Sequence, residues 1–233
     1  SILKSFKGPF FGIDGIRKEL QVKDRPLVGT IVKPKLGLNS RDHAACAYSA
    51  WLGGCDATKD DENLSSQTFN LFERRLALTL ETKDKAEEET GEKKAYLVNV
   101  TAETNEMIRR AELVKKMGGK FCMIDVLTAG FAALQTLRQA NLKLGIHGHR
   151  AMHAAITRNK KHGISMLALS KLYRLIGIDQ LHIGAIVGKM EGEAKEVIKI
   201  GDEIEENLIK ADEGAHVLEQ KWHNIKPMLA VCS

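Results

Sequence analysis

The sequence predicts an α/β fold with parallel strands, because short apolar segments alternate along the chain with longer segments of helical periodicity. Residues 27–32 (LVGTIV) are mainly apolar, which is typical of a strand buried on both faces. No G-x-G-x-x-G turn follows this segment, which disfavours a dinucleotide-binding sheet, and no hairpin signal lies within the alternating units of the chain. Six further strand-like segments lie at residues 55–58, 95–101, 121–126, 144–148, 180–183 and 228–232.

About seven strands are therefore expected, one fewer than in a complete (β/α)8 barrel. We predict a TIM-type barrel that is incomplete, lacks its eighth unit and forms one domain over residues 1–233. Ser40 is expected to cap a helix over residues 41–52, and Ser165 and Gly177 to bracket a helix over residues 166–176. Further helices are expected around residues 68–89, 107–117, 131–140 and 193–209.

Composition narrows the class of protein. The chain has 233 residues, 43% of them hydrophobic, and a net charge of +5. Lysine and arginine are scattered among acidic residues, so a mixed solvated surface is a better interpretation than nucleic-acid binding. The sequence has neither a membrane-spanning apolar run nor a stretch resembling a secretory signal, so we expect a cytoplasmic protein without a membrane partner. Its four cysteines form no C-x-x-C pair and are expected to be buried, reduced thiols.

Ionisable residues gather where the predicted strands end, which is where TIM-type barrels carry their functional groups. Taken singly, each has an ordinary explanation, such as a solvated acidic turn or a lysine that extends along the surface. Their joint occurrence at successive strand ends is a stronger signal. The residues are Lys33, Lys35, Lys59, Asp60, Asp61, Glu62, Asn99, Thr101, Asp125, His147, His149, Arg150, His153, His182, Lys189 and Ser233.

Three groups of these residues suggest chemistry. The carboxylates at residues 60–62 offer the oxygen ligands that Mg²⁺ prefers. The histidines at residues 147, 149 and 153 could form a zinc site, but Arg150 among them favours a phosphate or carboxylate. Lys33 or Lys35 could act as a base if it is buried, because burial lowers the pKa of a lysine. Lys189 lies in a glycine-flanked loop that could close over a ligand. Together these groups predict a Mg²⁺-dependent enzyme that removes a proton next to a carbonyl of a phosphorylated small molecule.

Longer motifs then resemble one family. Residues 53–63 (GGCDATKDDEN) resemble the metal-site signature of ribulose-1,5-bisphosphate carboxylase/oxygenase (RuBisCO) large chains. Residues 33–37 (KPKLG) are similar to the first-strand motif of that family, and residues 147–153 (HGHRAMH) to the fifth. Residues 182–184 (HIG) and 187–192 (VGKMEG) are similar to the sixth strand and its mobile loop. The resemblance covers nearly the whole chain and is strongest to archaeal members.

The resemblance implies a metal site at Lys59, Asp61 and Glu62. An activating CO₂ would convert Lys59 to a carbamate, whose oxygens would bind Mg²⁺ together with the two carboxylates. Because the carbamate forms only on a neutral amine, the resemblance also leads us to expect a lowered pKa for Lys59.

The resemblance also implies the reaction and its other participants. Ribulose-1,5-bisphosphate would form an enediolate that attacks CO₂ and yields 3-phosphoglycerate, with O₂ competing; in archaea this activity serves the salvage of nucleoside ribose, including that of AMP. A homo-oligomer built from dimers with shared active sites is expected. By the same resemblance, Lys33 would help to deprotonate the sugar at C3 and later protonate the product, and Lys35 would support Lys33 through hydrogen bonds. His149 would transfer a proton, and Arg150 and His182 would bind a substrate phosphate. Lys189 would stabilise the added carboxylate, and Ser233 would form a hydrogen bond with the sugar.

Two alternatives stay open on the sequence. One is a RuBisCO-like enolase or isomerase of sulfur salvage, although Lys33, His149, Arg150, His182 and Lys189 favour the carboxylase. The other is a non-catalytic barrel fragment that needs a completing partner, because the N-terminal domain of the family and the last barrel unit are not found in this sequence.

Overall fold

The computed structural model describes residues 2–159, 161–187, 194–210, 219–222 and 225–232. The chain divides into two compact units. Unit 1 comprises Ser1–Ile13, Asp125–Gln139 and Gly145–Ser233, and unit 2 comprises Asp14–Ile124 and Ala140–Leu144. The assignment of the whole chain to one domain stays a prediction.

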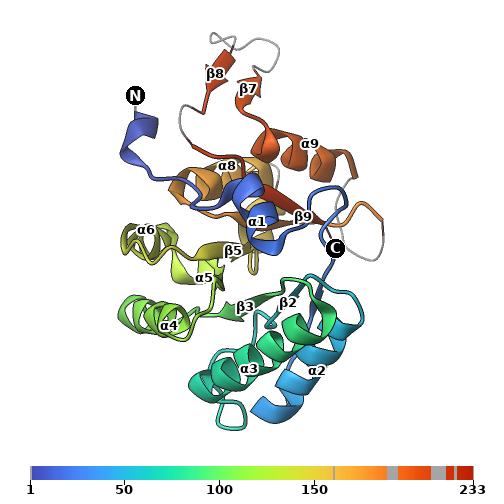
Figure 1. The fold of residues 1–233 in the computed structure, drawn as a ribbon. Coiled ribbons are helices and arrows are strands. Elements are labelled where there is room, and N and C mark those ends of the chain that lie inside the picture. Colours follow the sequence, from blue (N-terminus) through green and yellow to red (C-terminus); the bar gives the residue numbers. More distant parts are fainter. Residues whose placement is uncertain (1, 160, 188–193, 211–218, 223–224, 233) are drawn as a thin grey trace. The chain divides into compact units, whose positions relative to one another are not determined.

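Unit 2 contains a parallel sheet with the strand order β1-β2-β3-β4 (Figure 1). The strands are β1 (Gly29–Ile31), β2 (Ala57–Lys59), β3 (Ala95–Asn99) and β4 (Phe121–Asp125), whose last residue belongs to unit 1. The helices are α1 (Gly12–Leu20), most of which lies in this unit, α2 (Ser40–Leu52), α3 (Phe72–Thr90) and α4 (Thr104–Lys116). All residues of β3 and β4 are buried, and α2 packs against α3.

Two predictions for unit 2 were wrong in detail. The first strand is not buried on both faces: Gly29 and Thr30 are exposed and Val28 is 51% exposed, because β1 is an edge strand that pairs only with β2 in this unit. The cap of α2 is Asn39 and not Ser40. The Asn39 side chain accepts hydrogen bonds from the backbone N–H groups of residues 41 and 42, at 2.9 and 3.0 Å, so the helix begins one residue earlier.

Unit 1 contains three parallel strands, β5 (Gly145–His149), β6 (Gln180–Gly184) and β9 (Leu229–Cys232). A short 3₁₀ helix, η1 (Ile2–Ser5), precedes helices α5 (Val126–Ala129), α6 (Phe131–Gln139), α7 (Ala154–Thr157), α8 (Met166–Ile176) and α9 (Ala194–Glu205). The predicted caps of α8 are confirmed: the Ser165 hydroxyl accepts from the Ala168 N–H at 3.2 Å, and Gly177 ends the helix with φ +132°.

The segment after α9 corrects two further expectations. A helix was expected up to residue 209, but α9 ends at Glu205, and β7 (Leu208–Lys210) pairs antiparallel with β8 (Glu219–Lys221). Each of the two strands has only three residues, which is too short for hydrophobic periodicity to distinguish a strand from the end of a helix. The expectation of buried thiols holds for Cys122 but is wrong for Cys46 and Cys232, which are exposed.

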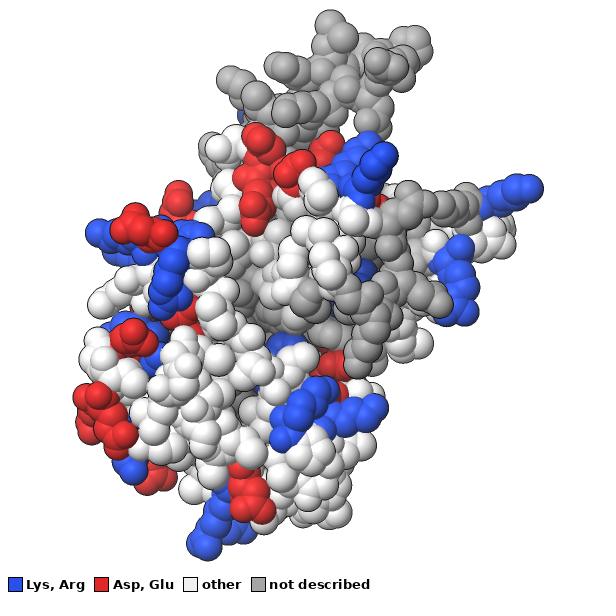
Figure 2. Space-filling model, turned by 90° about the vertical axis from the view of Figure 1, so that its right-hand side faces the viewer, with Lys and Arg blue, Asp and Glu red and all other residues white. Residues whose placement is uncertain are grey.

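The surface charges and the helices agree with what the composition predicts. On the face shown in Figure 2, Lys and Arg side chains lie interspersed with Asp and Glu. None of the described helices is both long enough and apolar enough to cross a bilayer.

A buried carboxylate ties unit 1 together at the start of β6. Asp179 is fully buried and accepts four hydrogen bonds. Its Oδ1 accepts from the backbone N–H groups of Phe11 and Gly12, at 2.6 and 3.0 Å. Its Oδ2 accepts from Arg138 Nη2 at 2.6 Å and from the Ile146 N–H at 2.8 Å. One side chain thus links the N-terminal segment, α6 and β5.

Replacing Asp179 with alanine is expected to lower the free energy of unfolding by about 3–5 kcal/mol, because the buried Arg138 loses its compensating charge. Urea denaturation followed by circular dichroism measures this change. Asp202→Ala, at an exposed position on α9, is the matched control and should have little effect. Equal effects of the two substitutions would contradict the role assigned to Asp179.

Candidate active site

The predicted metal segment follows β2 in unit 2. The Lys59 side chain is only 4% exposed. Its Nζ donates to the backbone carbonyl of Asp60 at 2.9 Å and to Met123 Sδ on β4 at 3.6 Å. The same Nζ lies 3.7 Å from Glu62 Oε2. The structure therefore places a buried amine beside a carboxylate three residues later.

Asp61 is a buried, hydrogen-bonded carboxylate. Its Oδ2 accepts from Lys33 Nζ at 2.6 Å, and its Oδ1 accepts from the backbone N–H and the side-chain amide of Asn63, at 3.0 and 2.8 Å. Burial alone raises the pKa of Asp61, but the hydrogen bonds from Lys33 and Asn63 outweigh burial, so the pKa lies below its ordinary value. Asp61 is therefore ionised at neutral pH, which is the state that binds a cation.

The two lysines that follow β1 are not buried. The Lys33 side chain is 57% exposed and reaches Asp61 from the loop after β1, and Lys35 is also exposed. Of the two alternatives, a buried lysine or one that extends along the surface, the structure shows the second, and a catalytic role for either lysine stays a prediction. What distinguishes Lys33 is its ion pair with a carboxylate of the predicted metal segment.

Asp60 has a different role from its acidic neighbours. It is fully buried and accepts hydrogen bonds from Tyr96 Oη at 2.6 Å, the Asn99 N–H at 2.9 Å and Arg75 Nε at 3.1 Å. His43 Nε2 lies 3.1 Å from its Oδ1. Burial alone raises the pKa of Asp60, but the charge of Arg75 and the bonds from His43 and Tyr96 hold it well below its usual range. Asp60 is therefore a structural anchor of the loop.

Three histidine rings lie together in unit 1. The His182 ring centroid lies 4.9 Å from that of His147 and 5.5 Å from that of His149, both with edge-to-face geometry. His149 Nδ1 accepts from the Ala151 N–H at 3.1 Å and lies 3.5 Å from Asp125 Oδ1. Because Nδ1 accepts this hydrogen bond, Nε2 is the ring nitrogen that is placed to carry a proton. The sequence pattern had suggested zinc here, but the described residues contain no group of three His, Cys, Asp or Glu side chains placed to hold a metal.

Arg150 follows β5 and packs against the end of β6. At Gly184, where φ is +128°, a Cβ atom would lie 3.1 Å from Arg150 Nη2 and 3.2 Å from Val197 Cγ2. Only glycine combines this backbone conformation with space for the guanidinium group. Burial lowers the pKa of Arg150, and Glu196 partly opposes that effect. Its position makes Arg150 a candidate ligand for an anion.

The predicted site residues fall into two groups, one in each unit. In unit 2, Lys33 contacts Asp61 and Lys59 lies close to Glu62, while in unit 1 the His149 and His182 rings are in contact. Lys189 and Ser233 lie outside the described residues. The sequence pattern missed the supporting residues Asn63, Arg75 and Tyr96, of which Arg75 had the clearest signal: a charged residue on the apolar face of a helix.

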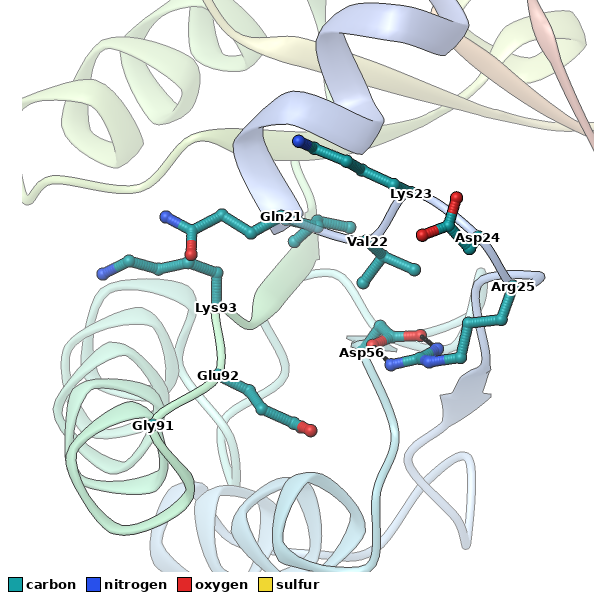
Figure 3. A pocket seen from close by; sticks show the side chains of 10 residues that line it. Gln21, Val22, Lys23, Asp24, Arg25, Asp56, Gly91, Glu92 and Lys93 are labelled. Carbon is teal, nitrogen blue, oxygen red and sulfur yellow. Dashed lines mark hydrogen bonds and ion pairs between the residues drawn. The ribbon is translucent and has the colours of Figure 1, made fainter.

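Unit 2 also contains a cavity of about 440 Å³ (Figure 3). The loop around residues 20–25, residues 91–93 and Asp56 line it, and Arg25 forms a two-point ion pair with Asp56 at 2.6 and 2.7 Å. Asp56 precedes β2, whereas the metal segment follows it. None of the predicted site residues lines this cavity.

His153 provides a test of the electrostatics in unit 1. Burial lowers its pKa below the usual 6.5, and the neighbouring Arg150 and His149 lower it further. We expect an NMR titration midpoint for His153 below 6.5, and Arg150→Gln should raise it by removing a positive neighbour. The His153→Gln variant assigns the resonance. The unfolded chain binds a proton at His153 at a higher pH than the folded chain does. Protonation of His153 should therefore lower the free energy of unfolding as the pH falls below 6.5. A midpoint at or above 6.5 would contradict this description.

Comparisons with known proteins identify the family. Residues 12–233 match the family described as "Ribulose bisphosphate carboxylase large chain, catalytic domain". A ribulose bisphosphate carboxylase of Methanocaldococcus jannaschii is 57% identical over 231 residues, which cover 99% of this chain and 54% of that protein. The enzyme of the same name from Methanosarcina mazei is 56% identical, with 100% of this chain and 55% of that protein covered.

Solved structures agree with the sequence relatives. The dimeric archaeal Rubisco of Hyperthermus butylicus matches with a TM-score of 0.91 at 46% identity, covering 99% of this chain and 54% of that one. The octameric Rubisco of Pyrococcus horikoshii matches with a TM-score of 0.90 at 47% identity, covering 99% of this chain and 52% of that one. The predicted fold class, an α/β TIM-type barrel that is incomplete, is confirmed.

This chain spans about half the length of the relatives it matches. The relatives named above are all carboxylases, which gives no support to the enolase alternative. On the match over residues 12–233 and on this level of identity, the chain belongs to the family of ribulose bisphosphate carboxylase large chains, within its catalytic domain.

Proposed function

We propose that this chain is the catalytic part of a carboxylase/oxygenase that converts ribulose-1,5-bisphosphate, CO₂ and water into two molecules of 3-phosphoglycerate. O₂ would compete with CO₂ for the enediolate. The observation that carries the proposal is the placement of Lys59, Asp61 and Glu62 in one short segment, with the buried Lys59 amine 3.7 Å from Glu62. That arrangement occurs in a chain whose relatives are named for this activity.

The residues of this segment fit a hard cation. Asp61 and Glu62 offer carboxylate oxygens, and Asp61 is ionised at neutral pH. Lys59 as an ammonium group would repel a metal, but as a carbamate formed with an activating CO₂ it would offer two further oxygens. We infer that Lys59, Asp61 and Glu62 would hold Mg²⁺, which would polarise the substrate carbonyl and stabilise negative charge on its oxygen. The lowered pKa expected for Lys59 stays a prediction.

Lys33 would move protons at C3 of the sugar. In the structure its Nζ donates a hydrogen bond to Asp61 Oδ2. Lys33 would have to leave Asp61 before its amine could reach C3 of the sugar. Competition by a cation for the same carboxylate would favour that departure. Lys35 would support Lys33 through hydrogen bonds.

Residues of unit 1 would bind and orient the substrate. Arg150 and His182 would contact a phosphate group, and the histidine geometry supports a proton on Nε2 of His149 that is available for transfer. Lys189 would stabilise the added carboxylate, and Ser233 would form a hydrogen bond with the sugar. The motif resemblance alone supports these two roles.

We also propose a homo-oligomer built from dimers that share active sites, in the cytoplasm, acting in the salvage of nucleoside ribose. Similar solved structures are those of a dimeric and an octameric archaeal Rubisco, which supports self-association.

Fixation of labelled CO₂ tests the function. After preincubation with bicarbonate and Mg²⁺, the chain is expected to incorporate label into acid-stable product only when ribulose-1,5-bisphosphate is added. Lys59→Ala should abolish this incorporation, because no carbamate can form. Lys115→Ala, at an exposed position on α4, is the matched control and should leave it unchanged.

Incorporation by Lys59→Ala equal to that of the parent would show that the site assignment is wrong. Absence of incorporation by the parent would mean that this chain alone does not carry out the proposed reaction.

A further inference from the structure

We propose that Arg75 is a positioning residue for the metal segment, residues 59–62, and that it holds this segment through Asp60 and the loop that follows. This inference rests on the proposed metal site. It assigns a role to a residue that is not itself a metal ligand. Arg75 lies in the first turn of α3, so it comes from a different element than the ligands it would position.

Arg75 spans the whole connection between β2 and α3. Its side chain is fully buried. Nε donates to Asp60 Oδ2 at 3.1 Å, Nη2 donates to the Ser65 carbonyl at 2.7 Å, and Nη1 donates to the Asn70 carbonyl at 2.9 Å. The guanidinium carbon also lies 5.7 Å from the centroid of the Phe72 ring. One rigid group therefore fixes the beginning, middle and end of the loop.

The contacts of Asp60 and those of its neighbours lie in different directions. Asp60 is bonded to Arg75 on α3 and Tyr96 on β3. Lys59 instead contacts Met123 on β4, and Asp61 contacts Lys33 after β1. Anchoring Asp60 thus fixes the backbone from which the two flanking side chains extend. A shift of Asp60 would move both proposed metal ligands.

The three contacts need the shape of a guanidinium group and not only its charge. A lysine at position 75 would keep a cation near Asp60, and with it the compensation of the buried charge. Its single nitrogen could not also reach the carbonyls of Ser65 and Asn70, which lie on separate stretches of the loop. Arg75→Lys therefore separates the positioning role from charge compensation.

The test measures Mn²⁺ binding by electron paramagnetic resonance, with bicarbonate present, at a temperature where circular dichroism shows each variant to be folded. We expect Arg75→Lys to bind Mn²⁺ about 10- to 100-fold more weakly than the parent, the range typical of changes to residues that hold metal ligands in place. The matched control is Arg74→Lys, which changes the adjacent, exposed arginine and should leave the affinity unchanged.

The outcomes separate this inference from the proposed function. Unchanged Mn²⁺ affinity in Arg75→Lys, with or without a lower melting temperature, would overturn the positioning role and leave the metal site intact. A parent chain that binds no Mn²⁺, or a Lys59→Ala variant that binds it equally well, would overturn the metal site itself and this inference with it.

Discussion

The burial of the Asp60 carboxylate is the constraint on which the proposed site depends. An ionised carboxylate taken out of water is tolerated only when charged and hydrogen-bonding partners surround it. Here Arg75, Tyr96 and the Asn99 N–H supply those partners from α3 and β3, and His43 contributes from α2. Satisfying one buried charge thus brings two helices and a strand to a single point within the segment that carries the proposed ligands.

The fold class could be predicted because parallel strands buried on both faces leave a plain pattern. Each predicted strand segment overlaps an observed strand, and β3 and β4 are buried at every position. The misses have physical causes. The edge position of β1 depends on what pairs with it, and β7 and β8 are too short to leave a periodic pattern. At the start of α2, Asn39 and Ser40 are both good caps, so composition alone could not decide between them.

Some residues of the candidate site could be predicted from a local sequence motif, and others could not. Lys59, Asp61 and Glu62 are close in sequence, so a local motif was enough to predict them. Arg75 and Tyr96 reach Asp60 from 15 and 36 residues away, and nothing short of the folded sheet and helix brings them there. The exposure of Lys33 and Lys35 could not be decided from the sequence for a related reason: exposure is set by the surrounding chain, which sequence spacing does not describe.

The glycine at position 184 limits how this protein can be altered. Its backbone conformation excludes ordinary side chains, and the space that a side chain would need is held by Arg150. A laboratory library aimed at changing which phosphorylated sugar is accepted would therefore gain little by varying position 184 alone. A smaller residue at position 150 would free the space but would leave the backbone conformation unchanged, so position 184 should stay glycine in such a library.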